Sequence, residues 1–249
     1  MVIGVIPARL NSSRFPKKIL ADLNGKPMIV HVAEQASKAK KLDKVFIAID
    51  DKETQKALQN YDYNLIMTSK NHLSGTDRVS EVVKKERDAE IIINIQGDEP
   101  LLDPDLIDRL VSLFEYNNVN MATIVSRRIS VSDLLDKNIV KAILDEQQNV
   151  KDFKRDVQDN EIGAVYKHIG IYAFLRQTLF EFQSMKQSER EIKKSLEQLR
   201  ALDNGIQIRG LITNCEQISV DTVEDLNRVK RKMGISTDTN YEKDKVQPD

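Results

Sequence analysis

Ile3-Gly-Val-Ile-Pro-Ala-Arg-Leu-Asn-Ser-Ser-Arg-Phe-Pro-Lys-Lys-Ile-Leu20 is the segment around which we expect the rest of the chain to be built. It begins with a continuous apolar run, which is the pattern of a strand buried on both faces. The run breaks at Pro7 into a loop with four closely spaced cations: Arg9, Arg14, Lys17 and Lys18. A buried strand that empties into a cationic loop at the start of an α/β chain predicts a phosphate-binding site. The alternative is that these side chains form only a solvated turn.

Downstream of this loop, buried strands alternate with amphipathic helices. The apolar spacing predicts helices over 28–36, 51–58, 79–85 and 105–114, and strands over 44–50, 63–68 and 90–96. Such alternation over the first 115 or so residues predicts a parallel sheet with right-handed crossovers.

The second half of the chain is less regular. We expect strands over 121–125, 139–144 and 166–174, a short alternating stretch over 206–209, and helices over 178–185, 189–202 and 223–233. Residues 145–163 are polar and are expected to form exposed hairpins or a loop. We therefore predict one α/β domain over 1–235, with a nucleotide-binding half (1–118), a second half (119–235) and a polar tail (236–249).

Composition narrows the class of protein. The 249 residues carry a formal charge of −1, so no global field draws the chain to nucleic acid or to an anionic membrane. A single cysteine excludes an internal disulfide, and three histidines without ligand-like spacing argue against zinc. The apolar runs are too short to span a membrane and the N-terminus lacks a signal-type pattern. We expect a cytoplasmic protein that binds neither nucleic acid nor membrane.

Polar residues gather where buried strands are expected to end. The carboxyl ends of parallel strands meet at one edge of the sheet, where ligands bind. Arg9 and Lys18 suit a triphosphate there. Asp98 follows Gly97 after the most apolar strand, and a carboxylate near bound phosphates suits Mg²⁺. Alternatively, Asp98 only caps the turn into Pro100.

Asp221, in Ser219-Val-Asp-Thr222, is a second candidate carboxylate, although it could equally be the N-cap of the helix that follows. Two carboxylates and two cations suit phosphoryl or nucleotidyl transfer, in which catalysis is mostly positioning and charge neutralisation. The patterns G-x-x-x-x-G-K-[ST] and G-x-G-x-x-G are both absent. A nucleotide would therefore be bound by a different loop.

Six segments of the chain resemble, in order, the motifs of the 3-deoxy-manno-octulosonate (Kdo) cytidylyltransferase family, also called CMP-Kdo synthetases. The resemblance covers about residues 2–233. The segments are Ile6-Pro-Ala-Arg-Leu-Asn-Ser-Ser-Arg-Phe-Pro-Lys-Lys-Ile-Leu20, Met67-Thr-Ser-Lys-Asn-His-Leu-Ser-Gly-Thr-Asp-Arg78, Asn94-Ile-Gln-Gly-Asp-Glu-Pro100, His168-Ile-Gly-Ile-Tyr172, Leu196-Glu-Gln-Leu-Arg200 and Val220-Asp-Thr222.

This resemblance implies a nucleotide-diphospho-sugar transferase fold, with a Rossmann-like, mainly parallel sheet flanked by helices. It implies an enzyme that couples CTP to a 2-keto-3-deoxy sugar acid with Mg²⁺, releasing pyrophosphate, for lipopolysaccharide or surface polysaccharide synthesis. It also implies a homodimer built through the second half.

The resemblance further assigns roles to residues. Catalysis would fall to Arg9, Lys18 and Asp98, and the metal to Asp98 and Asp221. Arg9 and Lys18 would bind the CTP phosphates, and the cytidine would lie near Ala8, Ser74, Gly75 and Arg78. The sugar acid would face Gln96, His168, Tyr172, Glu197 and Gln198.

The chain also departs from the family pattern. Lys17 replaces a glycine in the opening motif, which predicts that this loop adopts a positive φ less readily. Ile19, Leu73 and Lys194 are further departures, and no Ile-Pro pair follows Phe153-Lys-Arg155. Because most of these changes lie on the sugar side, they leave open whether the acid is Kdo, an amino-Kdo or another sugar acid.

Two other functions fit the same residues. One is a nucleotidyltransferase of the same fold that activates another sugar acid or a sugar phosphate. The other is a non-catalytic nucleotide-binding protein. The presence together of Arg9, Lys18, Asp98 and Asp221 argues against the second of these.

Overall fold

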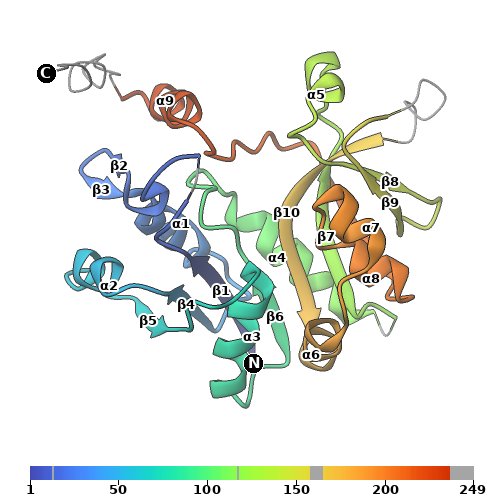
Figure 1. The fold of residues 1–249 in the computed structure, drawn as a ribbon, viewed down its shortest axis with the longest axis horizontal. Coiled ribbons are helices and arrows are strands. Elements are labelled where there is room, and N and C mark those ends of the chain that lie inside the picture. The colour runs from blue at the N-terminus through green and yellow to red at the C-terminus, as the bar shows by residue number, and fades with distance from the viewer. Residues whose placement is uncertain (13, 117, 158–164, 236–249) are drawn as a thin grey trace, which may run out of the picture.

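The fold is built on one mixed, nine-stranded sheet, in a computed structural model that describes residues 1–12, 14–116, 118–157 and 165–235. The main path of the sheet runs β11-β7-β10-β6-β1-β4-β5, and β8 and β9 extend it beside β10 (Figure 1). The strands are β1 (Val2–Ala8), β4 (Lys44–Ile49), β5 (Asn64–Met67), β6 (Ile91–Asn94), β7 (Met121–Ser126), β8 (Lys141–Leu144), β9 (Val150–Lys154), β10 (Val165–Leu175) and β11 (Ile208–Thr213). A separate small hairpin pairs β2 (Asp22–Leu23) with β3 (Lys26–Pro27).

Strands β1, β4, β5 and β6 are parallel, whereas β10 runs antiparallel to both β6 and β7. The predicted mainly parallel sheet is therefore confirmed. The helices are α1 (Met28–Ala36), α2 (Lys52–Leu58), α3 (Gly75–Lys85), α4 (Pro104–Ser112), α5 (Val131–Leu135), α6 (Arg176–Ser184), α7 (Glu189–Lys194), α8 (Leu199–Asp203) and α9 (Val223–Lys232). Within the described residues, none of these helices is long and apolar enough to cross a membrane.

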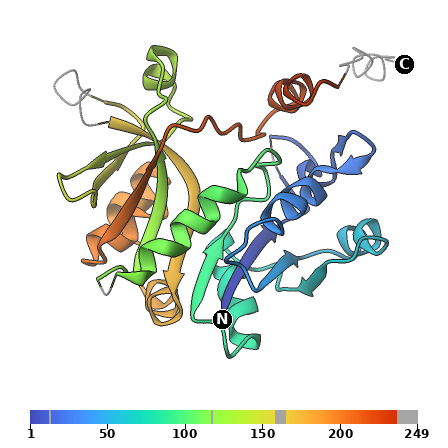
Figure 2. The ribbon, with the colours of Figure 1, turned by 180° about the vertical axis from the view of Figure 1, so that it is seen from behind.

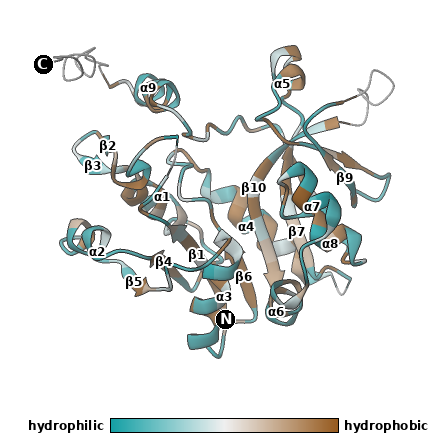
Figure 3. Ribbon diagram, viewed as in Figure 1, coloured by the Kyte–Doolittle hydropathy of each residue, from teal (hydrophilic) through white to brown (hydrophobic). Residues whose placement is uncertain are grey.

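The sheet is buried on both faces. Alternate residues of β1 enter two different cores: Ile6 packs with α1 and α4, and Val5 packs with α3 and α6. The first pair of helices covers the face seen in Figure 2, and the second pair covers the opposite face (Figure 1). Hydrophobic colour follows the central strands, while much of α3 and α9 is hydrophilic (Figure 3). This burial explains why the strands are continuous apolar runs.

The strand order reverses between β1 and β6, and the two strands separate at their carboxyl ends. Their pairing stops at Val5↔Asn94, although β1 itself continues through Pro7 to Ala8 beside β4. The prediction that the strand breaks at Pro7 was therefore wrong, because only the pairing with β6 ends there. Proline has no backbone N–H to donate, so it suits position 7, where β1 is no longer paired with β6. The resulting crevice is where ligands bind in open α/β sheets.

The last part of the chain returns to this crevice. After β11, at the far end of the sheet, the chain crosses back to α9 (Figures 1 and 2). There Leu226 and Val229 pack with Leu23 of β2 and Met28 of α1. Residues from about 218 onward thus come to lie beside the opening loop, almost 200 residues away in sequence.

Three helix and strand predictions are corrected by the structure. Helix α3 begins at Gly75, four residues before the predicted start, because Ser74 caps it in a capping box with Asp77. The predicted helix over 189–202 is two helices, α7 and α8, separated at Ser195 with φ 51°. The predicted polar segment 145–163 forms a hairpin as far as it is described, to residue 157, but its strand β9 buries Phe153 completely. Residues 158–163 and the predicted polar tail 236–249 lie outside the described residues.

The prediction for Lys17 was also wrong. Lys17 adopts a left-handed conformation, with φ 53° and ψ 30°, at the start of the short 3₁₀ turn Lys18–Leu20. Its ammonium donates to Glu53 at 2.6 Å, and the next turn places Ile19 in the core. The cost of a non-glycine residue in this region is small enough for such local contacts to offset.

Gly97 yields a testable prediction about this crevice. A Cβ at position 97 would lie 3.0 Å from the Pro7 carbonyl oxygen and 3.0 Å from Ile29 Cδ1. We expect Gly97→Ala to force the loops after β1 and β6 apart and to lower the free energy of unfolding by about 1–3 kcal/mol. Urea denaturation measures this change. Gly75→Ala is the matched control, because its Cβ would meet only the Pro7 side chain, at 3.3 Å. A loss at Gly97 no larger than at Gly75 would contradict the steric argument.

Candidate active site

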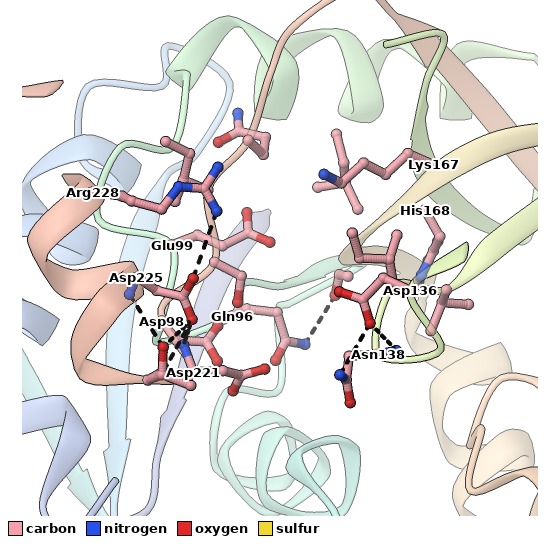
Figure 4. A pocket seen from close by; sticks show the side chains of 18 of the residues that line it. Gln96, Asp98, Glu99, Asp136, Asn138, Lys167, His168, Asp221, Asp225 and Arg228 are labelled. Atoms are coloured by element: carbon pink, nitrogen blue, oxygen red, sulfur yellow. Dashed lines mark hydrogen bonds and ion pairs between the residues drawn. The ribbon is translucent and has the colours of Figure 1, made fainter. Parts of the chain in front are cut away.

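The ammonium of Lys18 joins two carboxylates at the mouth of the crevice. Lys18 Nζ donates to Asp98 Oδ2 at 2.7 Å and to Asp221 Oδ1 at 3.0 Å. Lys18 comes from the loop after β1, Asp98 from the loop after β6 and Asp221 from the segment before α9. The backbone N–H of Val220 also donates to the Asp98 carbonyl at 2.9 Å, which holds the two acidic segments together. Figure 4 shows Asp98 and Asp221 side by side.

The alternative roles considered for these carboxylates do not hold. Thr222, not Asp221, is the N-cap of α9, and its hydroxyl accepts from Asp225 N–H. Among the described residues, the Asp98 side chain bonds to Lys18 and to no backbone N–H of the turn toward Pro100. Both carboxylates therefore face a cation and cap no local turn.

A divalent cation fits this donor set. Oxygens of two carboxylates already converge on one positively charged nitrogen, and Mg²⁺ needs few protein oxygens when phosphates and water complete its shell. The described residues contain no group of three or more acids, histidines or cysteines that could hold a metal by itself. Burial tends to lower the pKa of Lys18, but Asp98 and Asp221 outweigh that effect and raise it. Lys18 therefore stays charged.

Two further cations lie on the same loop. Arg14 donates to Asp221 Oδ1 at 3.1 Å. Arg9 is exposed and lines a second, smaller cavity with Asn11, Ser12, Pro16 and Lys17. Within the described residues, no hydrogen bond or ion pair engages its guanidinium. Arg9 is thus available to an anionic ligand.

The N-terminus of α3 faces the end of β1. Gly75 lies against Pro7, so that Ser74 and Gly75 approach the buried Ala8. Arg78, one turn further along, is only 2% exposed and donates to Asp50 at 3.0 Å. Asp50 in turn accepts from the Leu10 N–H at 3.0 Å, which fixes the start of the cationic loop. Arg78 therefore helps to fix this loop through Asp50. Its contact with a nucleotide stays a prediction.

A cavity of about 610 Å³ opens beside the carboxylates (Figure 4). Gln96 crosses its floor and donates to the Gly170 carbonyl of β10 at 2.9 Å. A Cβ at Gly170 would lie 3.2 Å from Gln96 Cγ, so the glycine makes room for this side chain. Of the predicted sugar-acid residues, Gln96 and His168 line this cavity, whereas Tyr172, Glu197 and Gln198 do not.

His168 is neutral and has a defined tautomer. Burial lowers its pKa to about 3. Its Nε2 lies 3.0 Å from the Thr123 hydroxyl, which itself donates to the Ile171 carbonyl at 2.9 Å. Because that hydroxyl has one proton, the two bonds coexist only if His168 Nε2 carries the hydrogen. Nδ1 is then a hydrogen-bond acceptor. Because the ring is neutral, His168 does not act as a general acid near neutral pH.

Buried polar atoms without partners surround the remaining predicted residues. Thr76 of α3 donates to Glu197 Oε2 at 3.0 Å and receives the Asn94 amide at 3.3 Å. In the part of the chain that the structure describes, Asn94 Oδ1, Tyr172 OH and Glu197 Oε1 have no hydrogen-bond partner. Burial raises the pKa of both the Tyr172 hydroxyl and the Glu197 carboxyl above their ordinary values. Such unpaired groups can form hydrogen bonds with hydroxyl groups of a ligand.

The cavity also contains Arg14, already noted as a cation of the opening loop, and residues to which the sequence assigned no role. The latter are Glu99, Asp136, Asn138, Lys167, Gln217, Asp225 and Arg228. Glu99 is the most unusual of them: it is 4% exposed, and its Oε2 has no partner among the described residues. Burial and the neighbouring Asp98 raise the pKa of Glu99 to about 8. The position of Glu99 directly after Asp98 in the sequence could have drawn attention to it, but only the fold shows that Glu99 is buried.

Glu99 predicts a pH-dependent stability. Its pKa is near 8 in the folded protein and 4.5 ordinarily, so between these values the folded state keeps a proton that the unfolded state has lost. Stability must then fall as pH rises through this window, by up to about 1.4 kcal/mol per pH unit. We expect Glu99→Gln to lack this slope. Urea denaturation from pH 5 to 8 in metal-free buffer measures it, and parallel curves for the two proteins would refute the shift.

Comparisons with known proteins agree with this geometry. A family model described as cytidylyltransferase matches residues 3–208. A 3-deoxy-manno-octulosonate cytidylyltransferase of Trichlorobacter lovleyi is 40% identical, over 93% of this chain and 98% of its own length. An 8-amino-3,8-dideoxy-manno-octulosonate cytidylyltransferase of a Shewanella species is 38% identical, over 93% and 98% of the two chains.

Solved structures give the same result. A CMP:2-keto-3-deoxy-manno-octonic acid synthetase complexed with CTP has a TM-score of 0.87 and 37% identity, over 94% of this chain and 98% of its own. A glucose-1-phosphate thymidylyltransferase described as putative, from Bacillus anthracis, shares only the fold, with a TM-score of 0.70 at 15% identity over 96% and 98% of the two chains. By its sequence and its fold together, the chain belongs to the cytidylyltransferase family.

Proposed function

We propose that this protein couples CTP to a 2-keto-3-deoxy sugar acid, either Kdo or an amino-Kdo, and releases pyrophosphate. The observation that carries the proposal is the cluster of Lys18, Asp98 and Asp221 at the mouth of the sheet crevice, beside a cavity lined with polar side chains. Relatives with both sugar-acid names are about equally similar to this chain, which supports the class of acid without choosing between the two.

The nucleotide fits the first half of the sheet. Arg9 and Lys18 bind the phosphates, since both are cations of the loop after β1 and Arg9 has no partner within the described residues. Ala8, Ser74 and Gly75 flank the cytidine at the start of α3, whose N-terminal N–H groups favour anions and acceptor atoms. Arg78 contributes by holding Asp50 and the loop.

Asp98 and Asp221 would hold Mg²⁺. When bound, the ion neutralises phosphate charge and makes a coordinated hydroxyl more acidic. Arg14 neutralises part of the charge on Asp221 and closes this side of the cluster.

The second half of the sheet positions the sugar acid. Gln96 and His168 line the cavity, and His168 Nδ1 offers an acceptor to a sugar hydroxyl. Tyr172, Glu197 and Gln198 lie on β10 and before α8, and the first two provide unpaired polar atoms. Gln96 and His168 orient the acid from the cavity wall so that its anomeric hydroxyl faces the α-phosphate, and contacts of Tyr172, Glu197 and Gln198 with the acid stay predictions.

The chain's own residues then act mainly by position and charge. The anomeric hydroxyl oxygen attacks the α-phosphorus in line and its proton passes to solvent, the bond between that phosphorus and the α–β bridging oxygen breaks, and pyrophosphate leaves. Lys18 and Arg9 stabilise the charge that develops on the phosphates, and no protein side chain forms a covalent intermediate. A neutral His168 orients the acid and does not protonate it.

Homodimerisation and cytoplasmic location stay predictions. Helix α5 exposes Val131 and Leu135, at 74% and 77%, in the half of the chain where we expect the dimer interface. These two apolar side chains are available to a partner there.

The function is tested by measuring pyrophosphate release from each of the four nucleoside triphosphates with Mg²⁺ and a panel of sugar acids that includes Kdo and 8-amino-Kdo. We expect release with CTP and at least one acid. No release with CTP and any acid would overturn the proposal. Release with a sugar phosphate instead would show a different transferase of the same fold.

The carboxylates yield a sharper prediction. Asp98→Asn and Asp221→Asn keep side-chain size and should leave the fold intact, but each removes one charge from the proposed metal position. We expect turnover to fall by about 100-fold or more in each variant, because one missing electrostatic contact in a site of this kind typically costs that much. Asp103→Asn, at the N-cap of α4, is a matched control outside the cavity. Near-normal turnover of either variant at saturating Mg²⁺ would disprove its metal role.

A further inference from the structure

Two cations, the fully buried Lys141 and the half-buried Arg155, join the loops of the second half through backbone carbonyls. Lys141 of β8 is 0% exposed and is among the largest fully buried side chains. Its ammonium donates to the Asp136 carbonyl at 2.6 Å and to the Arg155 carbonyl at 2.8 Å. The guanidinium of Arg155 donates in turn to three carbonyls, those of Lys137, Lys194 and Ser195, at 2.9, 3.1 and 3.3 Å.

Five carbonyls of three separate segments are therefore held by two side chains. One segment is 136–137, which precedes the part of the cavity wall formed by Asn138, Ile139 and Val140. Another is 194–195, directly before Glu197 and Gln198. The third is Arg155 itself, directly after β9. Of the other two segments, one follows α5 and the other links α7 to α8.

Burying the Lys141 ammonium costs free energy of hydration, which its contacts with the neighbouring segments must offset. A fully buried ammonium requires hydrogen bonds to offset its lost hydration, and here carbonyls supply them. Lys141 is also directly opposite Lys154 on one side and Lys167 on the other, and like charges in that register repel. Ser195, which Arg155 holds, is in a left-handed conformation that a serine does not favour by itself.

We propose that Lys141 and Arg155 are positioning residues for the sugar acid: they set the distance between the 136–140 wall and the loop that carries Glu197 and Gln198. This inference rests on the proposed function of the site and adds two residues that touch neither substrate. The nucleotide loop and α3 lie in the first half of the sheet, and the contacts of Lys141 and Arg155 do not reach them.

Three variants test the proposal. Lys141→Met keeps the length of the side chain but removes its donors, and Arg155→Lys keeps the charge but loses the planar fork that reaches three carbonyls. Lys151→Met, an exposed lysine on the same hairpin, is the control. We expect both test variants to raise the KM for the sugar acid about tenfold or more, to change the KM for CTP less than twofold, and to bind CTP like the wild type. Lys151→Met should change neither constant.

Hydrogen–deuterium exchange gives a readout that does not depend on activity. In Arg155→Lys, amides of 136–140 and of 194–198 should both exchange about tenfold faster, while β1, β6 and α3 keep their protection. If the wild type proves inactive with every acid, exchange still tests whether Lys141 and Arg155 hold the two segments in place. The failure would then concern the proposed function alone. Unchanged exchange in either segment, or a KM for CTP that rises together with that for the acid, would overturn the inference. If Lys141→Met does not fold, Arg155→Lys decides.

Discussion

The contact of the Lys18 ammonium with the carboxylates of Asp98 and Asp221 organises the mouth of the crevice. It joins the first loop, the loop after β6 and the approach to α9 at one point. Each ion is partly buried, with side chains 13%, 22% and 36% exposed, so none of them is left without a counter-charge in the crevice. Removing one partner of such a group leaves the others uncompensated, which costs more than the attraction itself contributes. The same cluster also contains the charges that a nucleotide and its metal require.

The backbone conformation allows Lys18, Asp98 and Asp221 to come together. Strands β1 and β6 stop pairing at Val5, and Gly97 lets their loops approach where a side chain would collide with the Pro7 carbonyl. Lys17 adopts a left-handed turn that sends Lys18 inward. The chain then has to return across the sheet after β11, and the packing of α9 against β2 and α1 places Asp221. In the other half, Lys141 and Arg155 hold carbonyls of the loops that face the cavity. The first half of the sheet is thus organised by contacts between charged side chains, and the second half by cations that bind backbone carbonyls.

Much of this was predictable from the sequence, because strands buried on both faces are continuous apolar runs and caps follow simple rules. The strand ends also placed Lys18 and Asp98 at one edge of the sheet. Other features depend on contacts that local sequence does not encode. Ser195 breaks a helix whose spacing is otherwise regular, and Arg155 holds that break from a distant strand. Arg78 belongs to a recognisable motif, yet its burial against Asp50 follows only from the packing of α3 on the sheet. Glu99 is next to Asp98 in the chain, but its lack of a partner within the described residues is a property of the fold.

The most direct measurement is Mn²⁺ binding to the nucleotide-free and the CTP-bound protein, followed by electron paramagnetic resonance and corrected for Mn²⁺ bound to CTP alone. Without nucleotide, the Lys18 ammonium occupies the point where the two carboxylates converge, so Mn²⁺ should bind weakly. Phosphates that attract Lys18 should free both carboxylates, and we predict an affinity at least about tenfold higher with CTP, which Asp98→Asn abolishes. Equal affinity with and without CTP, or tight binding that survives Asp98→Asn, would contradict the account.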